Sequence, residues 1–216
     1  MINCKIKRDG KIESEVRQNG LTFIDNHGME RSNHIDSDAL EASLKEWHYQ
    51  KFGILNQHFL GKENNTMFSV MHEVRPAMML SIAVKGEGMK NVYEGRSFFK
   101  EVSWNAGDAN LCFLSGEGGV NVNLNRNTQL DMLSVVIPQP FIDQLIDRNP
   151  EVLEQLSPLS ASQSSIPIIF KDKRPLEESV IKVARDIQRS RMMGNHASKY
   201  VESKIIDCLS GFLLPD

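Results

Sequence analysis

The chain has 216 residues, of which 40% are hydrophobic and 25% are charged, and its formal net charge is −3. This composition is typical of a folded globular protein and argues against a disordered chain. A domain that binds nucleic acid by itself usually presents a basic face, so this charge balance argues against DNA or RNA as a direct partner.

The chain shows no signal for a membrane or an export pathway. No apolar run approaches the ~20 residues that a helix needs to cross a bilayer, and the first residues lack the apolar stretch of a signal peptide. Cys4, Cys112 and Cys208 lie far apart without a CxxC spacing, which is typical of free thiols in a reducing compartment. We therefore expect a cytoplasmic protein without a membrane partner.

Residues 1–46 form the least regular part of the sequence. The runs 4–7 and 21–24 are each compatible with a strand, and polar turn-forming residues surround both runs. The segment 38–45 has the composition of a short helix preceded by capping residues. We interpret this section as an arm that lies on the body of the protein.

Strand signals dominate the next section, residues 47–138. Turns are expected at 85–88, 105–108 and 115–119, where glycine is present. Spacing of roughly 8–12 residues between short strands predicts an antiparallel sandwich or barrel. The expected strands are 47–55, 67–74, 78–84, 89–93, 97–104, 109–114, 120–124 and 130–137.

Near Pro138 the hydrophobic period changes from two to about 3.6 residues, which predicts helices in the remaining section, residues 139–216. Pro140 suits the first position of a helix. A second short helix is expected at 151–156, followed by a serine-rich linker at 157–165. The apolar run 166–170 is compatible with a strand or with an extended docking segment.

Two amphipathic helices are expected at the end of the chain. The first places Leu176, Val180, Val183, Ala184 and Ile187 on one stripe, and Gly194 is a suitable stop. Joined by a short loop, the two helices would form an antiparallel hairpin. The second helix has more apolar surface than one neighbour would bury, which predicts a homodimer or a following domain. Its candidate dimer-interface residues are Val201, Ile205, Cys208, Leu209 and Phe212.

Four stretches of this region match a known pattern when they are taken in order. They are Met79-Leu-Ser-Ile-Ala-Val-Lys-Gly, Trp104-Asn-Ala-Gly-Asp-Ala-Asn-Leu, the strand 132–137 leading into Pro140-Phe-Ile-Asp-Gln-Leu, and Tyr200-Val-Glu-Ser-Lys-Ile-Ile-Asp-Cys-Leu. Together they resemble the N-terminal regulatory part of AraC/XylS-family transcription regulators, nearest to the pyochelin-regulator-like branch. The resemblance runs over about 170 residues, and the order of the motifs carries it more than any one motif.

The resemblance implies an α+β fold and a sensing role. A cupin-like antiparallel β-barrel or jelly roll (47–138) would bind a small-molecule effector. A C-terminal helical hairpin within 139–216 would mediate dimerisation and relay the signal. The resemblance also implies that a bacterial homodimer contacts DNA only through a C-terminal helix-turn-helix domain, which is absent from these 216 residues. On this interpretation the protein is not an enzyme.

Ligand pockets in small barrels are mostly apolar with a few polar groups. Strand alternation alone leaves open which residues of each strand face inward. Candidate inward positions are Met79, Ser81, Ala83, Trp104, Asn110, Cys112 and Leu114. The candidate ligand-binding residues are His72, Ser81, Trp104, Asn110 and Cys112.

A cupin-type metal-dependent enzyme is the alternative function. A catalytic metal needs about three converging ligands, and cupin enzymes usually present two histidines one residue apart. No pair of the six histidines has that spacing, and residues 86–119 contain none. His72 and Glu73 would point to opposite faces of a strand. We therefore predict no metal, no cofactor and no catalytic residue. A free-standing interaction protein with a filled barrel is the third possibility.

Overall fold

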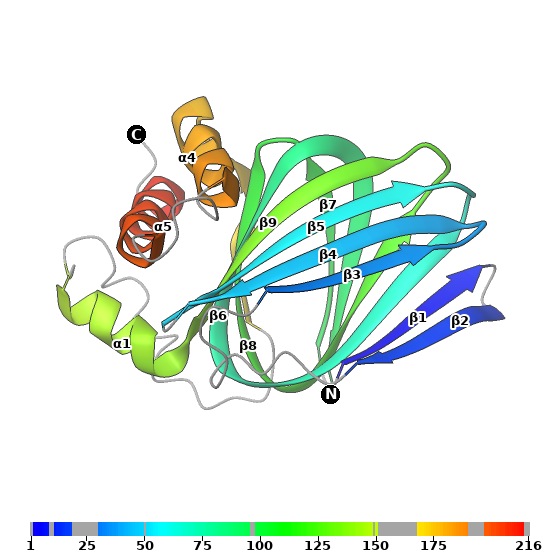
Figure 1. The fold of residues 1–216 in the computed structure, drawn as a ribbon, viewed down its shortest axis with the longest axis horizontal. Coiled ribbons are helices and arrows are strands. Elements are labelled where there is room, and N and C mark those ends of the chain that lie inside the picture. Colours follow the sequence, from blue (N-terminus) through cyan, green and yellow to red (C-terminus); the bar gives the residue numbers. More distant parts are fainter. Residues whose placement is uncertain are drawn as a thin grey trace.

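The computed structural model describes residues 2–8, 11–18, 30–49, 51–95, 98–148, 150, 168–189 and 197–213. Within these ranges the chain forms one antiparallel sheet and three helices (Figure 1). The strands are β1 (Ile2–Arg8), β2 (Lys11–Gln18), β3 (Glu30–Asp36), β4 (Leu40–His48), β5 (Gly53–Gly61), β6 (Thr66–Gly95), β7 (Phe98–Asn105), β8 (Asp108–Leu124), β9 (Gln129–Pro138) and β10 (Ile168–Pro175). The helices are α1 (Gln139–Arg148), α4 (Glu178–Arg189) and α5 (Ala197–Leu213).

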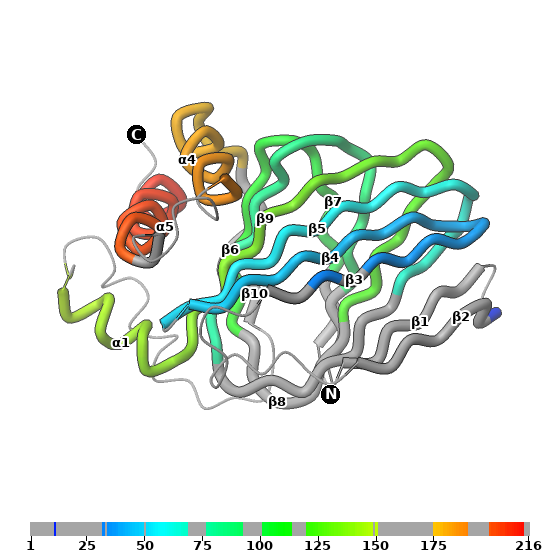
Figure 2. Tube along the Cα trace, viewed as in Figure 1, coloured from blue at the N-terminus to red at the C-terminus, as the bar shows by residue number. Residues whose placement is uncertain are grey.

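The sheet curls because its central strand is long and bent. The main strand order is β10-β8-β6-β9-β5-β4-β3, while β1 and β7 also pair with β6. Gly86 and Gly88 sit at the bend with φ angles of 97° and 79°, which L side chains rarely adopt. Val122 of β8 therefore pairs with Phe68 from one end of β6 and with Asn91 from the other. Figure 2 shows β3, β4, β5 and β9 side by side across the curl.

The curl separates two apolar clusters. Alternation along β6 places Ala83 on the inner face and Leu80 and Ile82 on the outer face, beneath the helices. The three helices lie together against one side of the sheet (Figure 1). The inner cluster consists of Leu40, Ala42, Phe59, Phe68, Ala83, Met89, Val102, Trp104, Val122, Leu124, Leu130 and Met132.

The apolar stripe of α5 packs against this chain's own sheet and helices. Val201, Ile205, Cys208, Leu209 and Phe212 are all buried in the outer cluster together with residues of β6, β8, β9, α1 and α4. This placement corrects the expectation that the five side chains form a seam between two chains. The outer face of the sheet buries the apolar surface of α5 that exceeded what one neighbouring helix could cover. The sequence did not reveal this face.

Residues 1–46 contribute strands to the sheet, and the boundary expected at residue 46 falls inside β4. The helix predicted at 38–45 is wrong, because residues 40–45 belong to β4 and pair with both β3 and β5. Leu40 and Ala42 are buried on one face of that strand, which is the alternation of a sheet. The run 21–24 lies outside the described residues.

Several turns differ from the prediction. The glycine-rich segment 115–119 does not turn, because it pairs with β6 inside the long strand β8. The strand expected at 47–55 is divided by a turn in which the Tyr49 amide donates a hydrogen bond to the carbonyl of Phe52. The turn at 105–108 is confirmed: the Asn105 amide donates to the Asp108 carboxylate at 2.6 Å.

The predictions for the last third of the chain mostly hold. The helix after Pro138 is confirmed as α1, and both amphipathic helices are confirmed as α4 and α5. Of the ambiguous run 166–170, the described residues 168–170 belong to β10, which pairs with β8. The helix expected at 151–156 and the linker at 157–165 lie outside the described residues.

Candidate functional site

A row of polar side chains crosses the inner face of the sheet. Asn110 of β8 pairs with Ser81 of β6, and Ser81 pairs with Ser134 of β9. Their exposed fractions are 1%, 3% and 1%. Directly opposite residues on adjacent strands have Cβ atoms about 4.5–5.5 Å apart, so the three side chains are neighbours. A continuous polar row therefore crosses the inner face among the apolar side chains of the inner cluster.

The hydroxyl groups of this row satisfy one another, and the amide does not. The Ser81 and Ser134 Oγ atoms are 2.9 Å apart, and Ser134 Oγ donates to Gln57 Oε1 at 3.4 Å. Asn110 Nδ2 and Oδ1 are both buried and have no hydrogen-bond partner among the described residues. A buried polar group without a partner costs about 1–3 kcal/mol. Asn110 is therefore a group with unused capacity to bind a ligand.

A carboxylate and an imidazole lie on the same face, two strands beyond Ser134 across the sheet. Glu46 and His48 are two residues apart on β4, and Glu46 pairs with Leu55, the partner of Ser134. His48 Nε2 and Glu46 Oε1 are 2.6 Å apart, with side-chain exposures of 3% and 7%. Neither residue was among the candidates from the sequence, because the boundary expected at residue 46 divided Glu46 from His48. Their spacing of two in a strand was the signal that could have found them.

The structure brings together three of the predicted ligand-binding residues. Ser81 and Asn110 are cross-strand partners, and Cys112 follows Asn110 on the same face of β8. Trp104 of β7 belongs to the inner cluster and is fully buried. It pairs with Met89 of β6. His72 pairs with Gly118 in the β6–β8 ladder, but its side chain lies outside the described part of the chain.

Cys112 and Cys208, the cysteines whose side chains the structure describes, are placed for packing. Burial raises the pKa of Cys112 from 9.0 to about 12, and burial together with the charge of Asp207 does the same for Cys208. The thiolate is the reactive form of cysteine. Both thiols therefore stay protonated at neutral pH, and neither is suited to nucleophilic catalysis.

In a Cys4→Ser background we expect Cys112 and Cys208 of the folded chain to resist iodoacetamide at pH 8. The urea-unfolded chain should be alkylated at both positions, and mass spectrometry of the digested protein measures the difference. A raised thiol pKa contributes stability that is complete below pH 9 and is lost as the pH rises from about 9 towards 12. Rapid alkylation of either cysteine in the folded chain would contradict the burial.

Metal-binding side chains are dispersed in the part of the chain that the structure describes. No group of three His, Cys, Asp or Glu side chains there could hold a metal ion. His58 Nδ1 and Asp131 Oδ1 are 2.5 Å apart, but both side chains are about one-third exposed and belong to the opposite face of β5 and β9 from Gln57. None of the described helices is long and apolar enough to span a bilayer.

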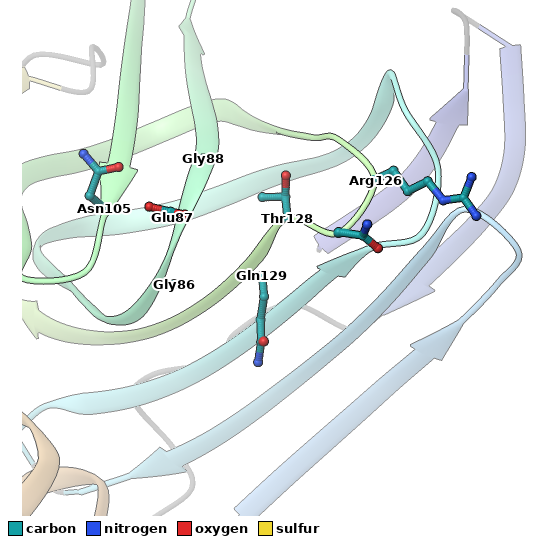
Figure 3. Close-up of a pocket in the computed structure, with 8 residues that line it drawn as sticks. Gly86, Glu87, Gly88, Asn105, Arg126, Thr128 and Gln129 are labelled. Atoms are coloured by element: carbon teal, nitrogen blue, oxygen red, sulfur yellow. The ribbon is translucent and has the colours of Figure 1, made fainter.

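A separate depression of about 510 Å³ lies at one end of the sheet. Figure 3 shows the bend at Gly86 and Gly88 on one side of it and the turn that carries Arg126 and Thr128 on the other. Five of its eight lining residues are exposed, and none has a buried polar atom that lacks a partner. The depression shares no residue with the polar row, which is the better-formed candidate. Its lining is Gly86, Glu87, Gly88, Asn105, Arg126, Asn127, Thr128 and Gln129.

Comparisons with known proteins give structural likeness only. No protein-family model matches the chain, and the curated protein sequences contain no significant match. The AraC-like transcriptional activator CuxR is similar at 12% identity and a TM-score of 0.43, over 80% of this chain and 57% of that one. The 7S globulin of Momordica charantia is similar at 11% identity and a TM-score of 0.37, over 69% and 49%.

A third similar structure is Fe(II)-HppE, at 9% identity and a TM-score of 0.35, over 52% of this chain and 58% of that one. The chain spans about half the length of these solved proteins. At such identities and TM-scores, these likenesses assign no function to the chain.

Proposed function

We propose that this chain is the effector-sensing domain of a bacterial AraC-type transcription regulator, and that its curled sheet is a cupin-like jelly roll. The observation that carries the proposal is Asn110, a buried amide with both polar atoms unpartnered on the inner face of the sheet. Ligand sites are mostly apolar with a few precisely placed polar groups, and this interior has that composition. The resemblance of the sequence motifs supplies the regulatory role.

The same strands that carry the polar row support the helices, which gives the proposal a route for the signal. Ser81 faces inward, while its neighbours Leu80 and Ile82 pack in the outer cluster with α1, α4 and α5. Gln188 of α4 donates a hydrogen bond to Asn56 of β5 at 3.0 Å. A ligand that shifts β6 or β5 would thus bias the position of the helices.

The charges around α5 connect the same helices to the sheet. Glu202 of α5 lies 3.6 Å from Lys51, in the turn between β4 and β5, and 3.5 Å from Arg148 of α1.

In this proposal the protein is cytoplasmic and catalyses no reaction. It acts as a homodimer through surfaces other than the buried stripe of α5, and a separate helix-turn-helix domain contacts DNA.

Ligand binding is the first test of the proposal. We expect thermal-shift screening of a chemically diverse library to find a small molecule that raises the melting temperature by about 5–10 °C near 100 times its Kd. Native mass spectrometry should then show one ligand per chain. A library in which no molecule raises the melting temperature would favour an interaction protein with a filled interior.

A cupin-type metal-dependent enzyme is the second candidate, because Glu46 and His48 present a carboxylate and an imidazole on the inner face. A catalytic metal needs about three converging ligands, and the described residues form no such group. Elemental analysis of the purified chain separates the two candidates. Stoichiometric iron, manganese, nickel or zinc that is lost in Glu46→Gln would favour the enzyme.

A further inference from the structure

We propose that the effector carries an uncharged amide-type group, such as a carboxamide, lactam or imide, and that the side-chain amide of Asn110 binds it through two hydrogen bonds. The inference rests on the proposed function and adds the chemical class of the ligand. It follows from three features of the interior. The side-chain amide of Asn110 has no hydrogen-bond partner among the described residues, the neighbouring side chains are hydrogen-bonded to one another, and the described buried residues carry few charges.

Asn110 offers a donor and an acceptor side by side. Nδ2 carries two N–H donors and Oδ1 accepts, and neither atom has a partner among the described residues. The side chain is 1% exposed, so water does not meet this need from the surface. The complementary group has an N–H next to a carbonyl oxygen, because two antiparallel hydrogen bonds then form at one edge. Primary amides, lactams and imides have this edge, because their N–H lies on the same side as the carbonyl oxygen.

The neighbours of Asn110 cannot take the place of a ligand. Ser81, its cross-strand partner, is bonded to Ser134, which in turn bonds to Gln57. Cys112, the next inward residue of β8, is a weak donor held protonated by burial. Within the polar row, Ser81 and Ser134 therefore have hydrogen-bond partners, and Asn110 is the member whose side chain has none among the described residues.

The described interior residues offer no lysine or arginine partner to an anionic ligand at this position. The buried polar residues that the structure describes include no lysine or arginine, and the buried acidic residues are Glu46 and Asp108. A buried carboxylate or phosphate needs a cationic partner to offset the loss of hydration. A cationic ligand would have to displace His48 from Glu46. An uncharged amide avoids both costs.

Benzamide and benzoate form a matched pair of probes, since they share a ring and differ in one polar group. We expect the 216-residue chain to bind benzamide at least tenfold more tightly than benzoate, which corresponds to about one hydrogen bond from a buried group. Ligand-observed NMR or calorimetry at millimolar probe concentrations measures both affinities. Equal binding, or tighter binding of benzoate, would overturn the proposed ligand class.

Two variants test the role of Asn110. Asn110→Leu should weaken benzamide binding at least tenfold and, without ligand, raise the melting temperature by about 2–6 °C because an unpartnered amide is removed. Asn91→Leu is the matched control: its Oδ1 is also buried and unpartnered, but Asn91 pairs with Val102 and Val122 instead of Ser81. It should leave the affinity unchanged. Asn110→Ala, which removes the amide without adding bulk or a charge, repeats the test if the leucine variant does not fold.

The outcomes separate this inference from the function on which it rests. If benzamide binding survives in Asn110→Leu, Asn110 is not the amide-binding group. If charged molecules bind and raise the melting temperature while benzamide does not, the amide class is wrong and effector sensing stands. If no molecule binds, both the ligand class and the sensing function fail.

Discussion

Replacing Ile205 with glutamate is expected to unfold the chain. The Ile205 side chain is 1% exposed and lies in the outer cluster between α5, α4 and the sheet. An unpaired carboxylate there costs several kcal/mol, which is comparable to the 5–15 kcal/mol that stabilise a typical domain. We expect Ile205→Glu to lose its cooperative thermal transition, as measured by circular dichroism.

Ser203→Glu is the matched control, because residue 203 is exposed on the same helix. It adds the same charge and should change the free energy of unfolding by less than about 0.5 kcal/mol. Sedimentation of all three proteins completes the test. If the unmutated chain is a dimer and Ile205→Glu is a folded monomer, α5 forms a seam between chains after all.

Gly86→Ala is expected to destabilise the chain by about 3–5 kcal/mol. A Cβ atom at this position would lie 1.9 Å from the backbone oxygen of Gln129, which the sheet holds in place, and the φ angle of 97° adds strain. Left-handed strain and overpacking each cost about 1–3 kcal/mol. The loss matters for the fold because Gly86 is at the bend that lets β6 pair with β8 at both ends. Urea unfolding measures the change.

Gly88→Ala separates the two causes. Gly88 has a similar φ of 79°, but a Cβ atom there would meet only the Thr128 side chain at 3.8 Å. This variant should therefore lose about 1–2 kcal/mol, from backbone strain alone. Equal losses in the two variants would mean that the close approach of Gly86 to Gln129 does not constrain the bend.

The hydrophobic periodicity of short segments predicted those helices and strands whose pattern is complete within the segment itself. The apolar stripe of α5 and the apolar run of β9 are visible within about ten residues of sequence, and both elements formed as expected. Segment 38–45 shows the limit. Its Leu, Ala, Glu and Lys residues favour a helix, but pairing with the neighbouring strands β3 and β5 makes it a strand, and the composition of the segment does not show that pairing. The glycines of 115–119 were misread for the same reason.

Some residues of the candidate site were predictable from the sequence, but their arrangement was not. Ser81 and Asn110 were each identified as candidates, but strand register decides that they are partners, and a shift of one residue would place them on the other face. The stripe of α5 was also identified, while its partner was assigned to a second chain. The outer face of the sheet that buries α5 emerges only when β6, β8 and β9 are assembled.

The side-chain NH2 group of Asn110 reports directly on whether the interior of the sheet takes up a small molecule. A benzamide titration of the ¹⁵N-labelled chain should shift this pair of resonances progressively to saturation, and the spectrum of Asn110→Leu identifies the pair by its absence. The NH2 pair of Asn105, which is exposed, should not move. Binding inside the sheet through Asn110 is contradicted if the Asn110 resonances stay unshifted at benzamide concentrations that saturate any other change in the spectrum.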